Sequence, residues 1–397
     1  MKRIVIIGGG IVGLAIAREL ILNGYKNLII LEKESDIANH QSSRNSGVMH
    51  AGLYYRPGSL KSKLSREGII LMKSYCKKHE IKWLECGKIV VAKNKAEEER
   101  LIKLFEKGLL NKLKDIEIIS SKQVSNLEPY VDAYKAIRVP EESIVNYKEV
   151  AKSFLREILS KGGEIKYNSK VVSIEETKSY EKRLKLSSGE YFDADIIISA
   201  SGLYSDKVSK MLGIDIDQQQ IIPFKGEYYF LKEGYKHLVN NLVYPIPKEE
   251  FPFLGAHFTK MIDGELEVGP NAVLSHSREG YSWNNINIIE LIDSIRYPGL
   301  RNFLMMYPKT SFEEIFRSIF KKLFVEKLKD IVPDISESML VKGRPGIRAQ
   351  IMKRNGELVM DFDIRIKENI ISVLNAPSPA ATSSIAIAKY ILKYADL

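Results

Sequence analysis

Residues 2–35 read KRIVIIGGGIVGLAIARELILNGYKNLIILEKES, and this stretch predicts the first unit of the fold. Residues 4–7 form a short β-branched run that is typical of a buried parallel strand. Residues 11–22 repeat apolar side chains at helical spacing. Residues 28–31 predict a second buried strand, which stops at Glu32. The order strand, helix, strand is typical of a doubly wound nucleotide-binding domain.

Three glycines at the first strand–helix junction give the pattern G-x-G-x-x-G. The first permits a tight turn, the second lets the backbone approach a pyrophosphate, and the third lets the helix pack against the strand. The free N–H groups at the start of the helix would face phosphate oxygens, and Glu32 lies at the expected distance to bind a ribose. The predicted dinucleotide contacts are Gly8, Gly10, Ile11, Val12, Gly13, Glu32 and Lys33. The pattern fits NAD and FAD equally well, and a glycine-rich turn without a ligand is the alternative.

The composition describes a globular chain of 397 residues, long enough for about two or three domains. Cys76 and Cys86 match no zinc or CxxC spacing, which predicts a reducing compartment without disulfides. The six histidines form no cluster with metal-ligand spacing, so we expect no metal. The net charge of +10 is spread along the chain without a nucleic-acid-binding motif. A lysine-rich surface, an anionic substrate and an anionic membrane face remain as explanations of this charge.

The N-terminal residues resemble a signal peptide, because Lys2 and Arg3 precede an apolar run. Three consecutive glycines and the charged pair that follows them argue against this interpretation. No uninterrupted apolar stretch reaches the roughly 18 residues needed to span a membrane. We therefore expect a soluble, cytoplasmic protein, with peripheral binding to the inner face of the cell membrane left open.

A polar segment, HQSSRNSGVMHAGLYY at residues 40–55, follows the second strand. It is too polar for a core helix and too rich in glycine for a regular strand. A nicotinamide enzyme needs little at this position, whereas a flavin enzyme must hold a ribityl chain and a tricyclic ring beyond the pyrophosphate. We therefore expect the segment to bind FAD. Ser42, Ser43 and Arg44 are predicted to bind phosphate, and Asn45, Ser46 and Gly47 are predicted to line the ribityl chain and the ring edge.

The sequence resembles the FAD-dependent oxidoreductases of the D-amino-acid oxidase superfamily, and within it the L-2-hydroxyglutarate dehydrogenase/oxidase family. The resemblance covers nearly the whole chain. It rests on residues 40–55 and on CGKIVVA (86–92), SASGLYSD (199–206), IIPFKGEYY (221–229), FPFLGAHFT (251–259), VGPNAVL (268–274), GRPGIRAQ (343–350) and NAPSPAATSSIAI (375–387). Several of these segments are long and unusual, so the resemblance is specific.

The resemblance implies a mixed α/β (α+β) fold with a Rossmann-like FAD-binding domain and an antiparallel-sheet substrate domain, both discontinuous in sequence. The FAD-binding domain is expected to comprise residues 1–80, 145–215 and 341–397, and the substrate domain residues 81–144 and 216–340. Within the former, the sequence predicts a helix at 147–161 and strands at 164–174, 183–187 and 195–200.

Further FAD contacts are expected where small residues end a strand or begin a helix. The strand at 195–200 ends in small residues, and its turn would pass close to the phosphates. The final helix is expected to begin after residue 382, with its N–H groups facing the pyrimidine end of the flavin. A plain turn and an ordinary helix start are the alternatives. The predicted contacts are Val172, Ala200, Ser201, Gly202, Gly346, Ile347, Ser378, Pro379, Ala380, Ala381 and Thr382.

The implied reaction is the FAD-dependent oxidation of L-2-hydroxyglutarate to 2-oxoglutarate. A hydride leaves C2 for flavin N5, and a base takes the hydroxyl proton. His50 and His257 are the candidate bases, because histidine titrates near neutrality and both lie in segments that carry the resemblance. His257 is slightly favoured as the base, and His50 as a positioning or flavin-contacting residue. Covalent attachment of the flavin to His50 and a purely structural role for either histidine are left open.

A dicarboxylate substrate needs cationic groups in its pocket. Arg348 occupies the place where amine oxidases of the superfamily carry a carboxylate-binding arginine, and a bidentate pair contributes roughly 1.5–3 kcal/mol. A surface ion pair is the alternative for this residue. Arg344 or Lys225 is expected at the second carboxylate, although Lys225 stands where close relatives are expected to carry arginine and lacks its forked geometry. Tyr54, Tyr55 and Asn271 are predicted to donate hydrogen bonds in the site.

Three alternatives to this function stay open. Within the same superfamily, the substrate could be glycerol 3-phosphate or an amino acid. In a different class, the chain would be a dinucleotide-binding protein without catalysis, which the two histidines and Arg348 disfavour. The electron acceptor is expected to be a quinone or another acceptor, and less so oxygen.

Residues 286–329 are predicted to be helical and basic. Five apolar residues between 316 and 324 fall on one helical face, and this face is expected to pack on its own domain. A role in binding a membrane surface or a quinone is left open.

Overall fold

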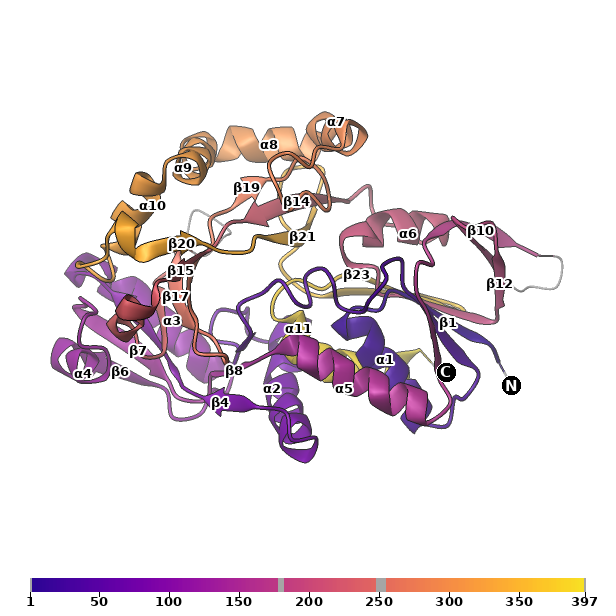
Figure 1. Ribbon diagram of the computed structural model, residues 1–397, viewed down its shortest axis with the longest axis horizontal. Helices are drawn as coiled ribbons and strands as arrows, with labels where there is room; N and C mark the ends of the chain where they lie inside the picture. Colours follow the sequence, from indigo (N-terminus) through magenta and orange to yellow (C-terminus); the bar gives the residue numbers. More distant parts are fainter. Residues whose placement is uncertain (1, 178–181, 248–254, 396–397) are drawn as a thin grey trace.

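The computed structural model describes residues 2–177, 182–247 and 255–395. It contains two large sheets, one mostly parallel and one mostly antiparallel, on opposite sides of the molecule (Figure 1). The mixed α/β fold expected from the sequence is confirmed. Among the described residues, no helix is long and apolar enough to cross a membrane.

The first sheet is built around the strand that precedes the glycine-rich turn. Its five neighbouring pairs are parallel except for β22 with β23, which is antiparallel. The strand order is β22 (Asp363–Lys367), β23 (Ile370–Asn375), β13 (Ile196–Ser199), β1 (Ile4–Ile7), β2 (Leu28–Leu31) and β9 (Glu164–Lys166). The sheet therefore joins three segments that lie far apart in the sequence.

Both faces of this sheet are covered, which explains why its central strands β1, β2, β13 and β23 are largely apolar. Ile4 and Ile6 pack towards the helices α1 (Ile11–Leu22), α5 (Tyr147–Ser160) and α11 (Ala380–Tyr394). Val5 and Ile7 pack on the other face, against a small antiparallel sheet. The strands and helix on that face are β10 (Val171–Glu176), β11 (Lys182–Leu186), β12 (Tyr191–Ala194) and α6 (Ser205–Met211).

Helix α11 lies in the middle of the helical layer. It packs against α1 and against α2 (Leu60–Lys78). The approach to α2 is close, because a Cβ at Gly68 would lie 2.6 Å from Cα of Ser383. The side chain of Ser59 caps α2 by accepting a hydrogen bond from the Ser62 N–H at 3.1 Å.

The second large sheet has eight strands and is antiparallel except for the parallel pair β16 with β5. Its order is β20 (Leu340–Lys342), β15 (Tyr229–Leu231), β18 (Leu266–Gly269), β17 (His257–Lys260), β16 (Leu242–Pro245), β5 (Lys88–Ala92), β7 (Lys135–Val139) and β6 (Glu117–Ser120). Helices α3 (Glu98–Leu110) and α4 (Ser121–Leu127) lie beside the strands β7 and β6 at one edge of the sheet.

Two three-stranded sheets connect the large ones. One comprises β3 (Val48–Met49), β8 (Ser143–Val145) and β4 (Trp83–Glu85), and the other comprises β19 (Val273–Leu274), β14 (Gln220–Gly226) and β21 (Gly346–Met352). Strand β21 was expected in the FAD-binding domain, but it pairs along its length with β14 of the expected substrate domain. The strand pairing thus does not follow the boundary expected at residue 341.

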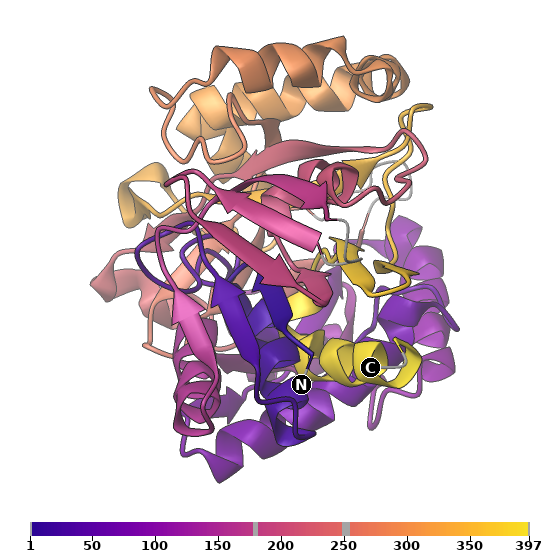
Figure 2. The ribbon, with the colours of Figure 1, turned by 90° about the vertical axis from the view of Figure 1, so that its right-hand side faces the viewer.

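An outer layer of four helices covers the side of β14 and β19 (Figures 1 and 2). The helices are α7 (Ile288–Arg296), α8 (Pro298–Met306), α9 (Pro308–Ile319) and α10 (Lys321–Leu328). Prolines begin α8 and α9, and the predicted apolar face around residue 320 is broken because Phe320 has extended backbone. Of the five residues expected to pack, only Phe324 is buried, whereas Phe316, Ile319, Phe320 and Leu323 are exposed.

Other predicted boundaries differ modestly from the structure. The strand expected at 164–174 is two strands, because Asn168 adopts a left-handed backbone with φ of 53° between them. The final helix begins at Ala380 rather than after residue 382. Residues 251–254 of the FPFLGAHFT motif lie outside the described residues.

Candidate functional site

The glycine-rich turn can be made only with glycine at two of its positions. Gly8 has a φ of +112°, and a Cβ there would lie 2.6 Å from the carbonyl oxygen of Ala200. A Cβ at Gly13 would overlap the carbonyl oxygen of Gly8. The turn is therefore compressed between β1, α1 and the end of β13, and it leaves the N-terminus of α1 facing the space beside the sheet.

Glu32 follows β2 and is buried next to this turn. Its carboxylate accepts hydrogen bonds from the N–H of Gly9 at 2.6 Å and of Glu34 at 2.8 Å. These bonds fix its orientation. An ionised carboxylate has about four acceptor positions, so Glu32 can still bind hydroxyl groups of a ligand.

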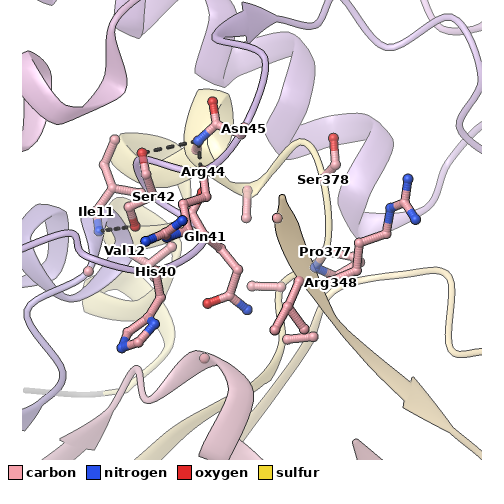
Figure 3. A pocket seen from close by; sticks show the side chains of 18 of the residues that line it. Ile11, Val12, His40, Gln41, Ser42, Arg44, Asn45, Arg348, Pro377 and Ser378 are labelled. Carbon is pink, nitrogen blue, oxygen red and sulfur yellow. Dashed lines mark hydrogen bonds between the residues drawn. The ribbon is translucent and has the colours of Figure 1, made fainter. Parts of the chain in front are cut away.

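The segment 40–47 is held against the start of α1 and against β21 (Figure 3). The Ile11 N–H donates to Oγ of Ser42 at 3.0 Å. Asn45 Nδ2 donates to the carbonyl oxygens of Gln41 at 2.8 Å and Ser42 at 3.0 Å, which folds the segment on itself. The approach to β21 requires glycine, because a Cβ at Gly346 would lie 2.6 Å from the carbonyl oxygen of Arg44.

A cavity of about 980 Å³ runs from the glycine-rich turn to the second large sheet. Most residues that the sequence predicted for the site lie in its walls. The lining residues among them are Gly8, Gly10, Ile11, Val12, Glu32, Lys33, Ser42, Arg44, Asn45, Ser46, Gly47, His50, Tyr54, Tyr55, Val172, Ala200, Ser201, Gly202, His257, Gly346, Ile347, Arg348, Ser378, Pro379, Ala380, Ala381 and Thr382.

Five predicted residues lie outside the described walls of this cavity. Gly13 acts through the close packing of α1, as predicted from its place in the motif. Ser43 is exposed, because the turn at 40–44 directs its neighbours Ser42 and Arg44 to the cavity instead. Arg344 is exposed in the connection before β21 and does not line this cavity, so its contact with a substrate carboxylate stays a prediction that the structure does not favour.

Lys225 and Asn271 are directed towards the buried carboxylate of Glu227 instead of the cavity. The Lys225 ammonium lies 3.5 Å from Oε1 of Glu227 and 3.6 Å from the ring centroid of Trp283. Asn271 Nδ2 donates to Oε2 of Glu227 at 3.1 Å, and Asn271 Oδ1 accepts from the Glu227 N–H at 2.8 Å. Both side chains therefore have partners outside the cavity, and their expected role in binding substrate stays a prediction that this arrangement does not favour.

Arg348 reaches the cavity from β21. Its Nη1 donates to the carbonyl oxygen of Asn271 at 3.1 Å, so Asn271 orients the guanidinium through its backbone. Burial lowers the pKa of Arg348, but a guanidinium keeps its charge at neutral pH. The cavity thus contains a half-buried, oriented cation.

His50 is backed by a buried charge pair. Its Nδ1 lies 3.2 Å from Oε2 of Glu142, and the Lys88 ammonium lies 2.6 Å from Oε1 of the same carboxylate. The side chains of Lys88 and Glu142 are both 0% exposed. Burial alone would raise the pKa of Glu142, but the charges and hydrogen bonds of Lys88 and His50 lower it to about 2. The carboxylate is therefore ionised, and His50 donates from Nδ1.

His257 has a different environment. Its Nδ1 lies 2.9 Å from the carbonyl oxygen of Gly255, so this nitrogen carries the proton and Nε2 carries the lone pair. The ring stacks on Tyr244 with centroids 3.9 Å apart. Burial, together with the nearby charges of Arg348 and Lys88, lowers the pKa of His257 to about 3. His257 is thus a neutral hydrogen-bond acceptor at physiological pH.

Sequence reasoning missed four residues of this region. Glu142 and Lys88 support His50, Tyr244 supports His257, and Lys61 at the start of α2 is a buried cation in the cavity wall. A lysine at the head of the apolar run KIVVA was the one signal that pointed to a buried charge pair, because lysine is rarely buried unpaired. Glu142 has no comparable signal in its own surroundings.

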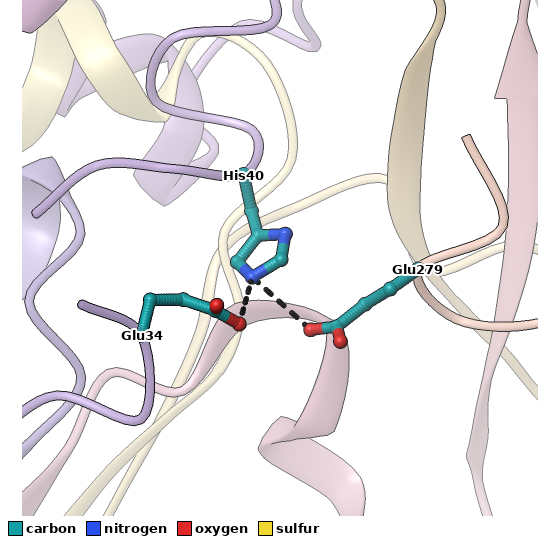
Figure 4. A group of neighbouring side chains, drawn as sticks. All are labelled: Glu34, His40 and Glu279. Atoms are coloured by element: carbon teal, nitrogen blue, oxygen red, sulfur yellow. Dashed lines mark hydrogen bonds and ion pairs between the residues drawn. The ribbon is translucent and has the colours of Figure 1, made fainter. Parts of the chain in front are cut away.

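Glu34, His40 and Glu279 form a separate cluster near the turn (Figure 4). Their nearest ligand atoms lie within 4.8 Å of one another, as in a metal site. However, the Lys33 ammonium contacts both carboxylates and lies 3.0 Å from Nε2 of His40. The acids therefore already have a cation, and the cluster joins the segment after β2 to the connection that precedes α7.

Comparison with known proteins gives concordant results. The model of the family described as FAD dependent oxidoreductase matches residues 3–394. An L-2-hydroxyglutarate dehydrogenase from Indibacter alkaliphilus is 43% identical, and the alignment covers 99% of this chain and 98% of that protein. The mitochondrial L-2-hydroxyglutarate dehydrogenase of Homo sapiens is 40% identical, with 98% of this chain and 87% of that protein covered.

Solved structures with a similar fold are more distant in sequence. An L-alpha-glycerophosphate oxidase from Mycoplasma pneumoniae with FAD bound has a TM-score of 0.79 at 21% identity, covering 100% of this chain and 95% of that chain. A glycine oxidase from Geobacillus kaustophilus has a TM-score of 0.74 at 16% identity, with the same coverage. At these identities, the likeness shows the fold alone.

Proposed function

Because the chain belongs to the FAD dependent oxidoreductase family, we propose that it oxidises L-2-hydroxyglutarate to 2-oxoglutarate. The observation that carries the proposal is that Arg348, His50 and His257 share one cavity with the glycine-rich turn. The names of the relatives from Indibacter alkaliphilus and Homo sapiens support this choice of substrate.

The residues of the cavity fit FAD. The N–H groups at the start of α1 suit a pyrophosphate, and the oriented carboxylate of Glu32 suits ribose hydroxyls. The segment 42–47 and the start of α11 would hold the remainder of the cofactor, since both line the same cavity. When bound, FAD supplies the acceptor for the hydride that leaves C2 of the substrate.

The two histidines are suited to different tasks. A proton on His50 would be stabilised by the ionised carboxylate of Glu142, as in other histidine–carboxylate pairs. A proton on His257 is disfavoured by burial and by the cations around it. We therefore assign His50 to accept the hydroxyl proton and His257 to accept a hydrogen bond through Nε2, reversing the preference drawn from the sequence.

Arg348 would bind the carboxylate next to C2, and Lys61 takes the place first proposed for Arg344 or Lys225. Lys61 is buried, lines the cavity and lies with its ammonium 4.8 Å from the ring centroid of Tyr55. The buried hydroxyl of Tyr54 has no hydrogen-bond partner among the described residues, so it would donate to the substrate.

A dye-linked substrate screen tests this proposal. The purified yellow protein is assayed with both enantiomers of 2-hydroxyglutarate, glycerol 3-phosphate and glycine, using an artificial electron acceptor. We expect turnover with the L-hydroxy acid. Activity confined to glycerol 3-phosphate or glycine would reject the substrate assignment. A colourless protein that takes up NAD, or one that turns over none of them, would favour the nicotinamide or the non-catalytic alternative.

We further propose that the outer layer α7–α10 contacts an anionic bilayer. A quinone in that bilayer would accept the electrons from the protein. Large apolar side chains are exposed along this layer, including Ile288, Ile289, Met305 and Phe312 at 67%, 79%, 70% and 64%. The acids of α9 are paired with Arg317, whereas Arg296, Arg301, Lys309 and Lys322 form no ion pair with a described residue. Apolar side chains beside unpaired cations suit the surface of anionic lipids.

A further inference from the structure

The buried pair of Lys88 and Glu142 behind His50 makes several contacts besides the one to the histidine. Oε1 of Glu142 accepts from the Lys88 ammonium at 2.6 Å and from the Ala51 N–H at 3.1 Å, while Oε2 faces Nδ1 of His50. The Lys88 ammonium also lies 4.8 Å and 5.1 Å from the ring centroids of Tyr54 and Tyr244. A buried ion pair is costly to desolvate and is weak evidence for stability, so its persistence here points to another task.

Three separate elements meet to build this pair. Lys88 is the first residue of β5, Glu142 precedes β8, and His50 follows β3. The Gly87 N–H donates to the carbonyl oxygen of Glu142 at 3.0 Å, which fixes the backbones beside both charges. Strands β3 and β8 are paired, with Met49 opposite Ser143, so His50 and Glu142 are neighbours across that ladder. The geometry of the pair is therefore set by strand pairing rather than by flexible side chains.

Resting on the proposed function, we propose that Lys88 and Glu142 act as positioning residues that orient His50 and set the pH range over which it accepts the proton of the substrate hydroxyl. The proton moves from the hydroxyl oxygen to Nε2 of His50, because Nδ1 is held by Glu142. The negative charge of Glu142 favours a proton on His50, and the positive charge of Lys88 opposes it, so removing either charge should change the proton affinity of His50.

The other groups near His50 come from several elements and bear on the same equilibrium. Arg348 adds a positive charge, His257 is neutral, and Arg66 is paired with Glu141 close to the Ala51 carbonyl. The tyrosines are neutral, since burial raises the pKa of each well above its usual value. They are Tyr54 and Tyr55 after β3, Tyr147 of α5 and Tyr244 of β16. The carboxylate of Glu142 is therefore the anion in direct contact with His50.

Opposite shifts in two isosteric variants test the proposal. The rate of flavin reduction by substrate is measured against pH without an acceptor. Lys88→Met removes a positive charge, so His50 should hold its proton to higher pH. The acid limb of the rate–pH profile, where the rate rises with pH, should therefore move up by about one pH unit. Glu142→Gln removes the negative charge, so the limb should move down by about one unit, with a plateau about 10-fold lower.

Two further variants separate positioning from folding. The double variant Lys88→Met/Glu142→Gln removes both buried charges, and its limb should return towards that of the unmodified protein. Arg138→Met removes a cation from β7 whose side chain is 44% exposed, and it should leave the profile unchanged. If the single variants are folded by thermal unfolding and their limbs stay in place or move in the same direction, the proposal is overturned.

A second measurement does not depend on the substrate. Histidine-labelled holoprotein is titrated by NMR, with the His50 signal assigned from His50→Asn. The titration midpoint of His50 should move in opposite directions in Lys88→Met and Glu142→Gln. If no substrate reduces the flavin, the proposed function fails, but this titration still decides whether the pair controls His50. Equal midpoints in both variants would overturn the role assigned to the pair.

Discussion

Arg348 combines charge with a fixed orientation, since its guanidinium is tied to the Asn271 carbonyl. Arg348→Lys keeps the charge but loses the two parallel hydrogen bonds that a guanidinium makes to a carboxylate. We expect KM for L-2-hydroxyglutarate to rise about 10- to 100-fold, which corresponds to the roughly 1.5–3 kcal/mol of a charge-assisted pair. Steady-state kinetics measure this change, and Arg344→Lys, which alters an exposed residue nearby, serves as the matched control. An unchanged KM would remove Arg348 from substrate binding.

His257 offers a fixed lone pair rather than a strong base. His257→Ala should lower kcat about 100-fold, because the hydrogen-bond acceptor that Nε2 supplies inside the cavity is lost, while the flavin stays bound. Turnover and the visible spectrum of the purified variant measure the two effects. His237→Ala changes a histidine that packs on Tyr130 away from the cavity and should keep full activity. Loss of flavin in His257→Ala would instead assign this residue to cofactor binding.

Lys61 predicts a pH dependence of substrate binding. Burial lowers the pKa of Lys61 to about 8, so the ammonium loses its charge as the pH rises through 8. KM for the dicarboxylate should therefore increase above pH 8, whereas a monocarboxylate 2-hydroxy acid should show no such rise. In Lys61→Met, KM should be high at every pH and flat across this range. A rise that persists in Lys61→Met would show that another group causes it.

At the scale of elements, the β1–α1–β2 unit depends on the absence of side chains at its glycine-rich turn. A methyl group at residue 13 would overlap the Gly8 carbonyl oxygen and push α1 away from β1. Gly13→Ala should therefore purify with little or no flavin, measured as absorbance per mole of protein. Gly234→Ala is the control, because a Cβ there meets nothing within 4 Å. Full flavin content in Gly13→Ala would show that the turn tolerates displacement of the helix.

This unit was predictable from sequence, and the region around residue 320 was not. In residues 4–31 the local signals agree with one another: β-branched strands, a helical repeat and glycines at the turn. Around residue 320 the apolar repeat correctly predicted helix but gave no information on what covers its face. Tertiary contacts decide that question, and here they bury Phe324 alone of the five residues.

The same limit explains why Lys225 and Asn271 lie outside the cavity walls expected from the sequence. Lys225 and Asn271 lie in segments that resemble a known family, so their positions in the chain were informative. The orientation of both side chains was decided by Glu227, whose carboxylate contacts each of them. The same carboxylate also accepts a hydrogen bond from Trp283 Nε1 at 2.9 Å. Which side chains reach one buried carboxylate depends on tertiary contacts. The sequence alone shows the residue types but not which of them will meet.

At the scale of the whole molecule, the exposed apolar layer predicts binding to lipid. The protein should sediment with vesicles that contain anionic lipid, and less with neutral vesicles or at high salt. The double variant Ile289→Asp/Phe312→Asp should remain in the supernatant and keep its activity with a dye acceptor. Leu110→Asp is the control, since Leu110 is 69% exposed on α3, outside the layer. Equal sedimentation of the double variant would contradict the proposed contact.

The family, the fold class and the FAD cofactor expected from the sequence are confirmed by the family match over residues 3–394 and by the sheets. These properties were predictable because they depend on long segments whose local patterns are consistent. The division into domains stays a prediction. Strand β21 pairs across the expected boundary, but strand pairing alone does not define domains. The catalytic roles of individual residues also stay predictions until the variants are measured.

The position of β23 and α11 has a consequence for folding during synthesis on the ribosome. The glycine-rich turn emerges long before β23 and α11, which flank β13 and α1. A nascent chain arrested before residue 363 would expose the apolar face of α1 and lack one wall of the cavity. Such chains should neither retain FAD nor resist protease, so FAD binding would have to wait until α11 has emerged.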